Sequence, residues 1–245
     1  MQVIGHRGAA ALAPENTWAS FDVALRLGVD ALETDVRATS DGELVLLHDE
    51  HLDRTTNGQG AVHSTPWSVV RALDAGGWFS AGFEGARVPL LRETLERYAP
   101  KTHLVLEIKQ AGIVRGVLKL VRALDMMERV TFTSFDFARA SRIKASAPEA
   151  KVGFLTADLD EATVARTLDA HLDQLCPPAA QVSRARVSAW KALGLEVRAW
   201  GVQTPELMMQ AVRAEVDGMT VDFPHLLLHV LGRTRPPTPP KTPFC

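Results

Sequence analysis

Residues 30–48 read DALETDVRATSDGELVLLH, and this stretch decides how the rest of the chain is interpreted. It holds two strand candidates, Asp30–Val36 and Glu43–His48, separated by the connector Arg37–Gly42. A parallel crossover needs a helix-sized connection, and this connector is too short to hold one. We therefore predict that the two strands pair antiparallel as a hairpin, with its turn at Ser40-Asp41-Gly42.

Short apolar segments alternate with helix-like segments along the chain, which predicts an α/β fold with a mostly parallel sheet. There is one strand more than the eight of a (β/α)8 barrel, and the hairpin accounts for the excess. We predict a TIM (β/α)8 barrel with an antiparallel hairpin irregularity. An open doubly wound sheet is the alternative, but no glycine-rich phosphate fingerprint follows the first strand.

The predicted strands are Gln2–Gly5, Asp30–Val36, Glu43–His48, His103–Ile108, Val130–Thr133, Val152–Leu155, Asp173–Leu175, Glu196–Val202 and Gly218–Val221. The predicted helices are Thr17–Leu27, Ile113–Leu124, Phe137–Ala147, Asp160–Leu172, Ser183–Leu193 and Pro205–Ala214.

Two parts of the chain break this alternation. Residues 50–88 are rich in glycine and predict a small loop-rich insertion above the barrel, with one short helix near Ser68–Leu73. Long insertions of this kind are commonly lids. Residues 233–245 are rich in proline and predict an extended or disordered tail, which leaves residues 1–232 as the barrel domain.

The composition excludes several classes of protein. The chain is 46% hydrophobic and 23% charged, which is ordinary for a globular protein. Its net charge of -2 gives no electrostatic case for nucleic acid or for an anionic membrane. Cys176 and Cys245 do not form a thiolate metal motif or a disulfide framework. No stretch predicts a signal peptide or a membrane anchor, so the expected location is cytoplasmic, and the oligomeric state stays open.

Acidic residues interrupt segments that otherwise look like buried strands. Glu33 and Asp35 lie two positions apart and so face one side, where buried carboxylates are costly unless they are paired or bind a metal. Glu107 ends another strand, and the ends of barrel strands converge on one face. Three carboxylates without a thiolate favour a hard divalent ion, Mg2+ or Ca2+. The alternative is a structural ion-pair network with Arg7 and Lys109.

Two histidines also stand at strand ends. His6 and His48 can act as a general base and a general acid near neutral pH, although a lone histidine at such a position is more often structural. Arg7, beside His6, offers a fork of donors suited to a phosphate. A salt bridge from Arg7 to Glu33 or Asp35 is the alternative.

Three further residues are weaker candidates. Asn16 is predicted to cap the helix that follows it. Trp200 and Phe135 lie at or just past strand ends, where they either belong to the core or line a pocket. The sequence has no GxSxG, Walker or HExxH motif, which argues against a serine hydrolase, a P-loop enzyme and a zincin.

Taken in order, these motifs resemble those of one family. IGHRGAAALAPENTWASF is followed by ALETDVRATSDGELVLLHDEHLDRTTNGQG, and the likeness continues through VPLLRETLE, LVLEIK, TSFD, LEVRAWGV and VDGMTVDFP. From Val3 to Pro224 the chain is similar to the glycerophosphodiester phosphodiesterase family. This resemblance implies a TIM barrel, dependence on a divalent metal, and cleavage of a small glycerophosphodiester to sn-glycerol 3-phosphate and an alcohol.

The resemblance also implies a role for each motif residue. It makes His6 and His48 the acid–base pair, and it makes Glu33, Asp35 and Glu107 the metal ligands. It implies that Arg7 holds the phosphate, with Lys109 close by, and we add Trp200 as a substrate-binding candidate because it lies near a strand end. The chain departs from the family at Gly201 and Gln203, where the family often has WTVN, and at Arg92, where an acidic residue is common.

Two other functions stay open beside this one. The first is a phosphodiesterase of the same superfamily that acts on lysolipid or sphingolipid headgroups. The second is a non-catalytic barrel that binds phosphodiesters. If the insertion is a lid, its aromatic residues Trp67, Trp78 and Phe79 are expected to contact the alcohol or glycerol end of the substrate.

Overall fold

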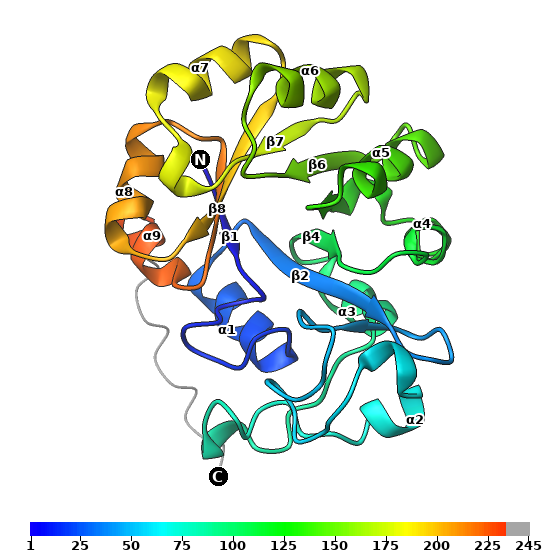
Figure 1. Ribbon diagram of the computed structural model, residues 1–245. Helices are drawn as coiled ribbons and strands as arrows, with labels where there is room; N and C mark the ends of the chain where they lie inside the picture. Colours follow the sequence, from blue (N-terminus) through cyan, green and yellow to red (C-terminus); the bar gives the residue numbers. More distant parts are fainter. Residues whose placement is uncertain (234–245) are drawn as a thin grey trace.

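The computed structural model describes residues 1–233 and shows a ring of parallel strands surrounded by helices (Figure 1). Neighbouring strands follow the order β1-β9-β8-β7-β6-β5-β4-β2, and pairing of β1 with β2 closes the ring. The predicted TIM (β/α)8 barrel is therefore confirmed. The strands are β1 (Gln2–Gly5), β2 (Ala31–Ala38), β3 (Leu44–Leu46), β4 (His103–Ile108), β5 (Val130–Ser134), β6 (Lys151–Leu155), β7 (Gln174–Cys176), β8 (Glu196–Val202) and β9 (Gly218–Val221).

The strand outside the ring is β3. It pairs antiparallel with β2, with Val36 opposite Leu46 and Ala38 opposite Leu44, which confirms the predicted hairpin. One more backbone hydrogen bond follows the strand, because the Leu47 N–H donates to the Asp35 carbonyl at 3.1 Å. The next residue, His48, is therefore held at the level of Asp35.

The helices cover the outside of the ring, and short polar residues begin several of them. Thr17 caps the first helix by accepting the N–H of Ser20, and Gly28 ends it in the left-handed region. The prediction that Asn16 caps this helix is wrong, since its side-chain amide donates to Asp35 instead. The helices are α1 (Trp18–Leu27), α2 (Trp67–Val70), α3 (Leu91–Tyr98), α4 (Val114–Ala123), α5 (Phe137–Ser146), α6 (Glu161–Asp169), α7 (Arg184–Ala192), α8 (Pro205–Arg213) and α9 (Pro224–Val230).

The main core lies between the strands and the surrounding helices. A second, small cluster of Ile4, Ala31 and Val105 is separate from it. They lie two positions before His6, Glu33 and Glu107, respectively. Residues two positions apart along a strand point to the same side of it. An apolar layer therefore lies next to the polar residues at the strand ends.

The insertion, residues 50–88, lies at one side of the barrel beside β2 (Figure 1). It contains α2 and two short 3-10 helices, η1 (Val62–Ser64) and η2 (Ala81–Phe83). Its buried residues, such as Leu52 and Val70, pack with Val45 and Leu47 of the hairpin in a cluster separate from the main core. The insertion therefore shares apolar contacts with the edge of the barrel.

In the described part of the chain, the helices are all too short or too polar to cross a membrane. The predicted tail falls outside the described residues, apart from Arg233, whose guanidinium is paired with Asp30. The tail and the cytoplasmic location therefore stay predictions.

Candidate active site

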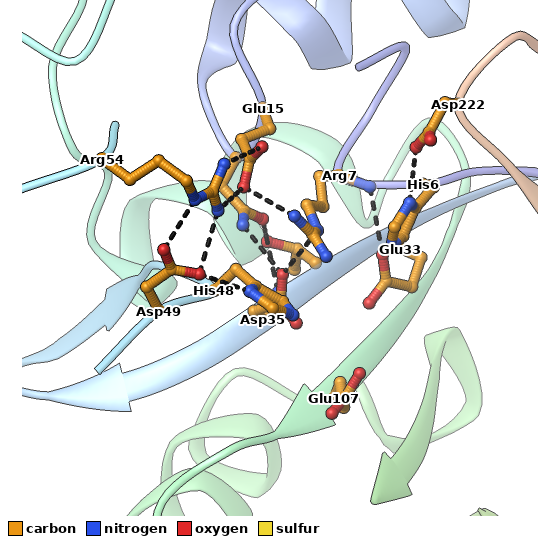
Figure 2. Close-up of polar contacts among 12 residues, drawn as sticks. His6, Arg7, Glu15, Glu33, Asp35, His48, Asp49, Arg54, Glu107 and Asp222 are labelled. Atoms are coloured by element: carbon orange, nitrogen blue, oxygen red, sulfur yellow. Dashed lines mark hydrogen bonds and ion pairs between the residues drawn. The ribbon is translucent and has the colours of Figure 1, made fainter. Parts of the chain in front are cut away.

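Polar side chains gather at the carboxyl ends of the strands, the face on which TIM-barrel active sites form. Figure 2 shows side chains from strands far apart in the sequence turned toward one another at this face. The predicted residues found together are His6 and Arg7 after β1, Glu33 and Asp35 on β2, His48 after β3, and Glu107 and Lys109 at the end of β4.

Glu33, Asp35 and Glu107 form a buried acidic cluster, in which one oxygen of each lies within 4.8 Å of the others. The strand register explains the cluster, because Asp35 is paired directly with Glu107 and Glu33 lies two positions earlier on β2. The Asp35 Oδ1 atom is buried and has no hydrogen-bond partner among the described residues. Oxygen donors at this spacing, with acceptor capacity left over, fit a hard divalent cation.

The three carboxylates differ in acidity. Burial and the charge of Asp35 raise the pKa of Glu33 to about 7. The same two causes raise the pKa of Glu107. Burial also acts against ionisation of Asp35, but Arg7 and Lys109 outweigh it and lower its pKa. Without a cation, Asp35 is the member of the cluster that is most readily charged.

Two cations partly balance the cluster. Arg7 Nε lies 3.2 Å from Asp35, and its backbone N–H donates to Glu33 Oε2 at 3.0 Å. Lys109 Nζ lies 2.8 Å from Glu107 and 3.6 Å from Asp35. Arg7 lines the cavity, and its guanidinium also pairs with Asp35. Its predicted role in binding a phosphate and its salt bridge to the acidic cluster are therefore compatible.

Asn16 holds Asp35 through hydrogen bonds. Its Nδ2 donates to Asp35 Oδ2 at 2.9 Å, and its Oδ1 accepts from the Thr34 hydroxyl at 2.6 Å and from the Asp35 N–H. The residue adopts a left-handed backbone with φ of 55°, a conformation that asparagine tolerates better than most residues. Asn16 therefore orients one of the acidic side chains.

His6 is paired with Asp222, which follows β9. Its Nδ1 lies 2.5 Å from Asp222 Oδ1, and its Nε2 lies 3.9 Å from Glu33 (Figure 2). Because an ionised carboxylate only accepts hydrogen bonds, Nδ1 carries a proton and Nε2 faces the acidic cluster. Burial lowers the pKa of His6, but the bond to Asp222 and the charge of Glu33 outweigh burial and raise it.

His48 has a matching arrangement. Its Nδ1 lies 2.6 Å from Asp49 Oδ1, and Arg54 in turn donates to both Asp49 and Glu15. Glu15 also accepts from Arg7 Nη1 at 2.7 Å, so a continuous polar chain joins the two sides of the site (Figure 2). Burial lowers the pKa of His48, and the neighbouring Asp35 only partly offsets that effect.

A cavity of about 230 Å³ opens beside these groups. Phe135 and Trp200 line it and pack edge to face, with ring centroids 4.8 Å apart. The Trp200 indole N–H donates to the Cys176 carbonyl at 2.8 Å, which fixes the ring. Among the described residues that line the cavity, none comes from 50–88, so the expected lid contacts of Trp67, Trp78 and Phe79 are absent there.

Several residues of this site were missed in the sequence. Asp222 follows the last strand as His6 follows the first, and that position could have identified it. Glu15 and Arg54 lie in loops, where no periodicity tells which side chains meet. Arg198 is a charge within a predicted strand, the same signal that identified Glu33.

The comparisons with known proteins agree with this geometry. A model of the glycerophosphoryl diester phosphodiesterase family matches residues 6–226. A glycerophosphodiester phosphodiesterase of Caldanaerobacter subterraneus subsp. tengcongensis is 35% identical over 94% of this chain and 98% of its own. The crystal structure of glycerophosphodiester phosphodiesterase from Agrobacterium tumefaciens has a TM-score of 0.85 at 34% identity, covering 94% of this chain and 99% of its own. An Oleispira antarctica phosphodiesterase, in complex with the product sn-glycerol-3-phosphate, has a TM-score of 0.86 at 28% identity, covering 95% and 97%.

Proposed function

The chain belongs to the glycerophosphoryl diester phosphodiesterase family and is a phosphoric diester hydrolase, and from this premise we propose a metal-dependent reaction run by a histidine pair. The substrate is a glycerophosphodiester, and the products are sn-glycerol 3-phosphate and an alcohol. The observation that carries the proposal is the convergence of three buried carboxylates and two histidines beside one cavity. The relative that was crystallised with sn-glycerol-3-phosphate supports the choice of substrate.

Glu33, Asp35 and Glu107 are the residues that would hold the metal, either Mg2+ or Ca2+. Asp35 Oδ1 accepts no hydrogen bond among the described residues, and the pKa of Glu33 is raised, so both observations indicate that the cluster lacks positive charge. When bound, the cation supplies Lewis-acid stabilisation of charge on the phosphate oxygens. Arg7 and Lys109, at the border of the cluster, share the charge of the phosphate.

His6 and His48 move the protons. In each ring an aspartate accepts from Nδ1, which leaves Nε2 to take a proton from the nucleophile or to give one to the departing alkoxide. The nucleophile is either water or the 2-hydroxyl of the substrate's glycerol. A cyclic phosphate trapped early in the reaction distinguishes the second route from the first.

The proposal is tested by measuring release of glycerol 3-phosphate from glycerophosphocholine, with and without EDTA. We expect EDTA to abolish release and Mg2+ or Ca2+ to restore it. His6→Ala and His48→Ala should each lower kcat by about 100-fold or more, the usual scale of a lost acid–base group. The exposed His229 provides the matched control, and His229→Ala should keep the wild-type kcat.

Three outcomes would contradict the proposal. Full activity in excess EDTA would exclude the metal. A wild-type rate in either histidine variant would exclude the pair. Faster turnover of lysophosphatidylcholine than of glycerophosphocholine would favour the lysolipid alternative.

A further inference from the structure

Arg198 is a buried cation without an ion-pair partner among the described residues. It lies on β8, its exposed fraction is 2%, and it lines the cavity of the active site. Its Nη1 donates to the Thr220 hydroxyl and the Cys176 thiol neighbours the guanidinium, but its Nε and Nη2 atoms have no oxygen acceptor in the described part of the chain. A buried charge with no counter-ion and with free donors is costly, so this arrangement needs an explanation.

The two unpartnered atoms share one edge of the guanidinium. Nε–H and Nη2–H point the same way and form the fork that holds two oxygen atoms at once. Thr133 adds a third free group, because its hydroxyl is fully buried, lines the same cavity and has no partner among residues 1–233. Three unsatisfied polar groups therefore border one small cavity.

The strand positions of Arg198 and Thr133 relate them to residues of the active site. Arg198 lies two positions before Trp200 on β8, and Thr220 lies two positions before Asp222, so each shares a side of the chain with a residue nearer the strand end. Thr133 on β5 is paired in register with Glu107 on β4. Thr133 thus lies beside the acidic cluster, and Arg198 lines the same cavity from β8.

We propose that the free edge of Arg198 and the Thr133 hydroxyl form a subsite that binds the two hydroxyl groups of the substrate's glycerol moiety. This inference rests on the proposed function, in which the phosphate lies between the acidic cluster, Arg7 and Lys109. The cavity of about 230 Å³, which both groups line, can hold a glycerol phosphate. The vicinal hydroxyls of glycerol supply two oxygens side by side, which match the fork of Arg198.

The proposal is tested by calorimetric titration of the full chain, in the presence of Mg2+ or Ca2+, with phosphate monoesters that differ only in the alcohol. Glycerol 3-phosphate carries both hydroxyls, propane-1,2-diol 1-phosphate lacks the terminal one, and propyl phosphate lacks both. We expect the wild type to bind glycerol 3-phosphate about 10- to 100-fold more tightly than propyl phosphate, the range for charge-assisted hydrogen bonds. Propane-1,2-diol 1-phosphate should lie between them.

Arg198→Met should remove most of that preference and keep the apolar stem. Thr133→Val, which replaces a hydroxyl by a methyl of similar size, should reduce the preference less. Arg198→Lys gives a second variant with the charge retained but without the fork, and it should also bind glycerol 3-phosphate more weakly. Arg213→Met is the matched control, because Arg213 is an exposed arginine on the helix that follows β8.

Thermal unfolding of the ligand-free variants separates binding from structure. If Arg198 serves binding and not stability, Arg198→Met should not lower Tm, because the substitution removes an uncompensated buried charge. An unchanged preference in Arg198→Met and Arg198→Lys, or an equal loss of affinity for all three esters, would refute the subsite. Tighter binding of 2-carboxyethyl phosphate than of glycerol 3-phosphate, lost in Arg198→Met, would instead assign the fork to a carboxylate.

Failure of this inference can be told from failure of the proposed function. If the chain does not release glycerol 3-phosphate from glycerophosphocholine, the proposed function fails, whatever the titrations show. If it does, and the wild type binds the three esters equally, only the role of Arg198 fails.

Discussion

At the scale of single residues, Glu33 couples stability to pH. The carboxyl of Glu33 has an ordinary pKa of 4.5 and a pKa of about 7 in the folded chain. Between these values the unfolded chain has released this proton while the folded chain still holds it. The metal-free protein should therefore lose stability as the pH rises from about 4.5 through about 7.

Glu33→Gln should reduce this loss, because glutamine has no proton to release. We expect the Tm of wild type in EDTA to fall across that pH range, and the Tm of the variant to fall less. Adding Mg2+ or Ca2+ at pH 8 should raise the wild-type Tm and leave the variant nearly unchanged. The exposed Glu93→Gln serves as control and should behave as wild type. Identical pH profiles in all three proteins would contradict the prediction.

Asp222 sets the protonation of His6. Its hydrogen bond helps to raise the pKa of His6 against the opposing effect of burial. A histidine with a raised folded pKa contributes stability that is present below its ordinary value of 6.5 and is lost as the pH rises through the folded pKa. Asp222→Asn should lower the pKa of His6 and remove part of that contribution.

NMR titration of the histidine rings in the metal-free protein measures this effect. His48 is the internal control, because its partner Asp49 is intact in the variant and its pKa should not move. A His6 pKa that stays at the wild-type value in Asp222→Asn would show that the hydrogen bond is not the cause.

At the scale of elements, the insertion contacts the site through Arg54, and we predict that this contact affects the reaction. Arg54 reaches from residues 50–88 to Asp49 and Glu15, which hold His48 and Arg7. Arg54→Gln should remove the hydrogen bonds to Asp49 and Glu15 and lower kcat by about 10- to 100-fold. That range is typical for the loss of a residue that orients the binding groups of a site.

Arg87→Gln is the matched control within the same insertion. Among the described residues, Arg87 donates only to the carbonyls of Ala72 and Leu73, so its loss should affect stability and not kcat. Steady-state kinetics and thermal unfolding of both variants test this pair of expectations. If Arg54→Gln lowered kcat no more than Arg87→Gln does, the bridge would have no role in the reaction.

The elements that were easy to predict have clear local signals. The hairpin follows from one short connector, and α5, α6, α7 and α8 each begin at a short polar residue that caps them. α3 and α9 were not predicted, and neither has a side-chain cap at its start. The buried residues Leu91, Thr94, Leu95 and Tyr98 of α3 nevertheless have helical spacing, a signal from which that helix could have been predicted.

At the scale of the whole molecule, the sequence was sufficient to predict which residues meet but not how they are supported. Glu33, Asp35 and Glu107 lie at ends of strands, and the barrel brings such ends together by symmetry. The supporting contacts from Asn16, Glu15 and Arg54 come from loops, whose paths depend on tertiary structure. The contact of the insertion with the site through Arg54, and not through its aromatic residues, was missed for the same reason.

The pairing of His6 with Asp222 has a consequence for protein synthesis. The two residues are 216 positions apart, and they follow β1 and β9, which lie side by side in the ring. While the chain is still emerging from the ribosome, His6 has no partner to orient it until nearly the last residue of the barrel has been made. We predict that nascent chains arrested before residue 218 do not hydrolyse glycerophosphocholine, whereas completed chains tethered by a C-terminal linker do. Activity in the arrested chains would show that the reaction does not need His6 to be oriented by the last strand.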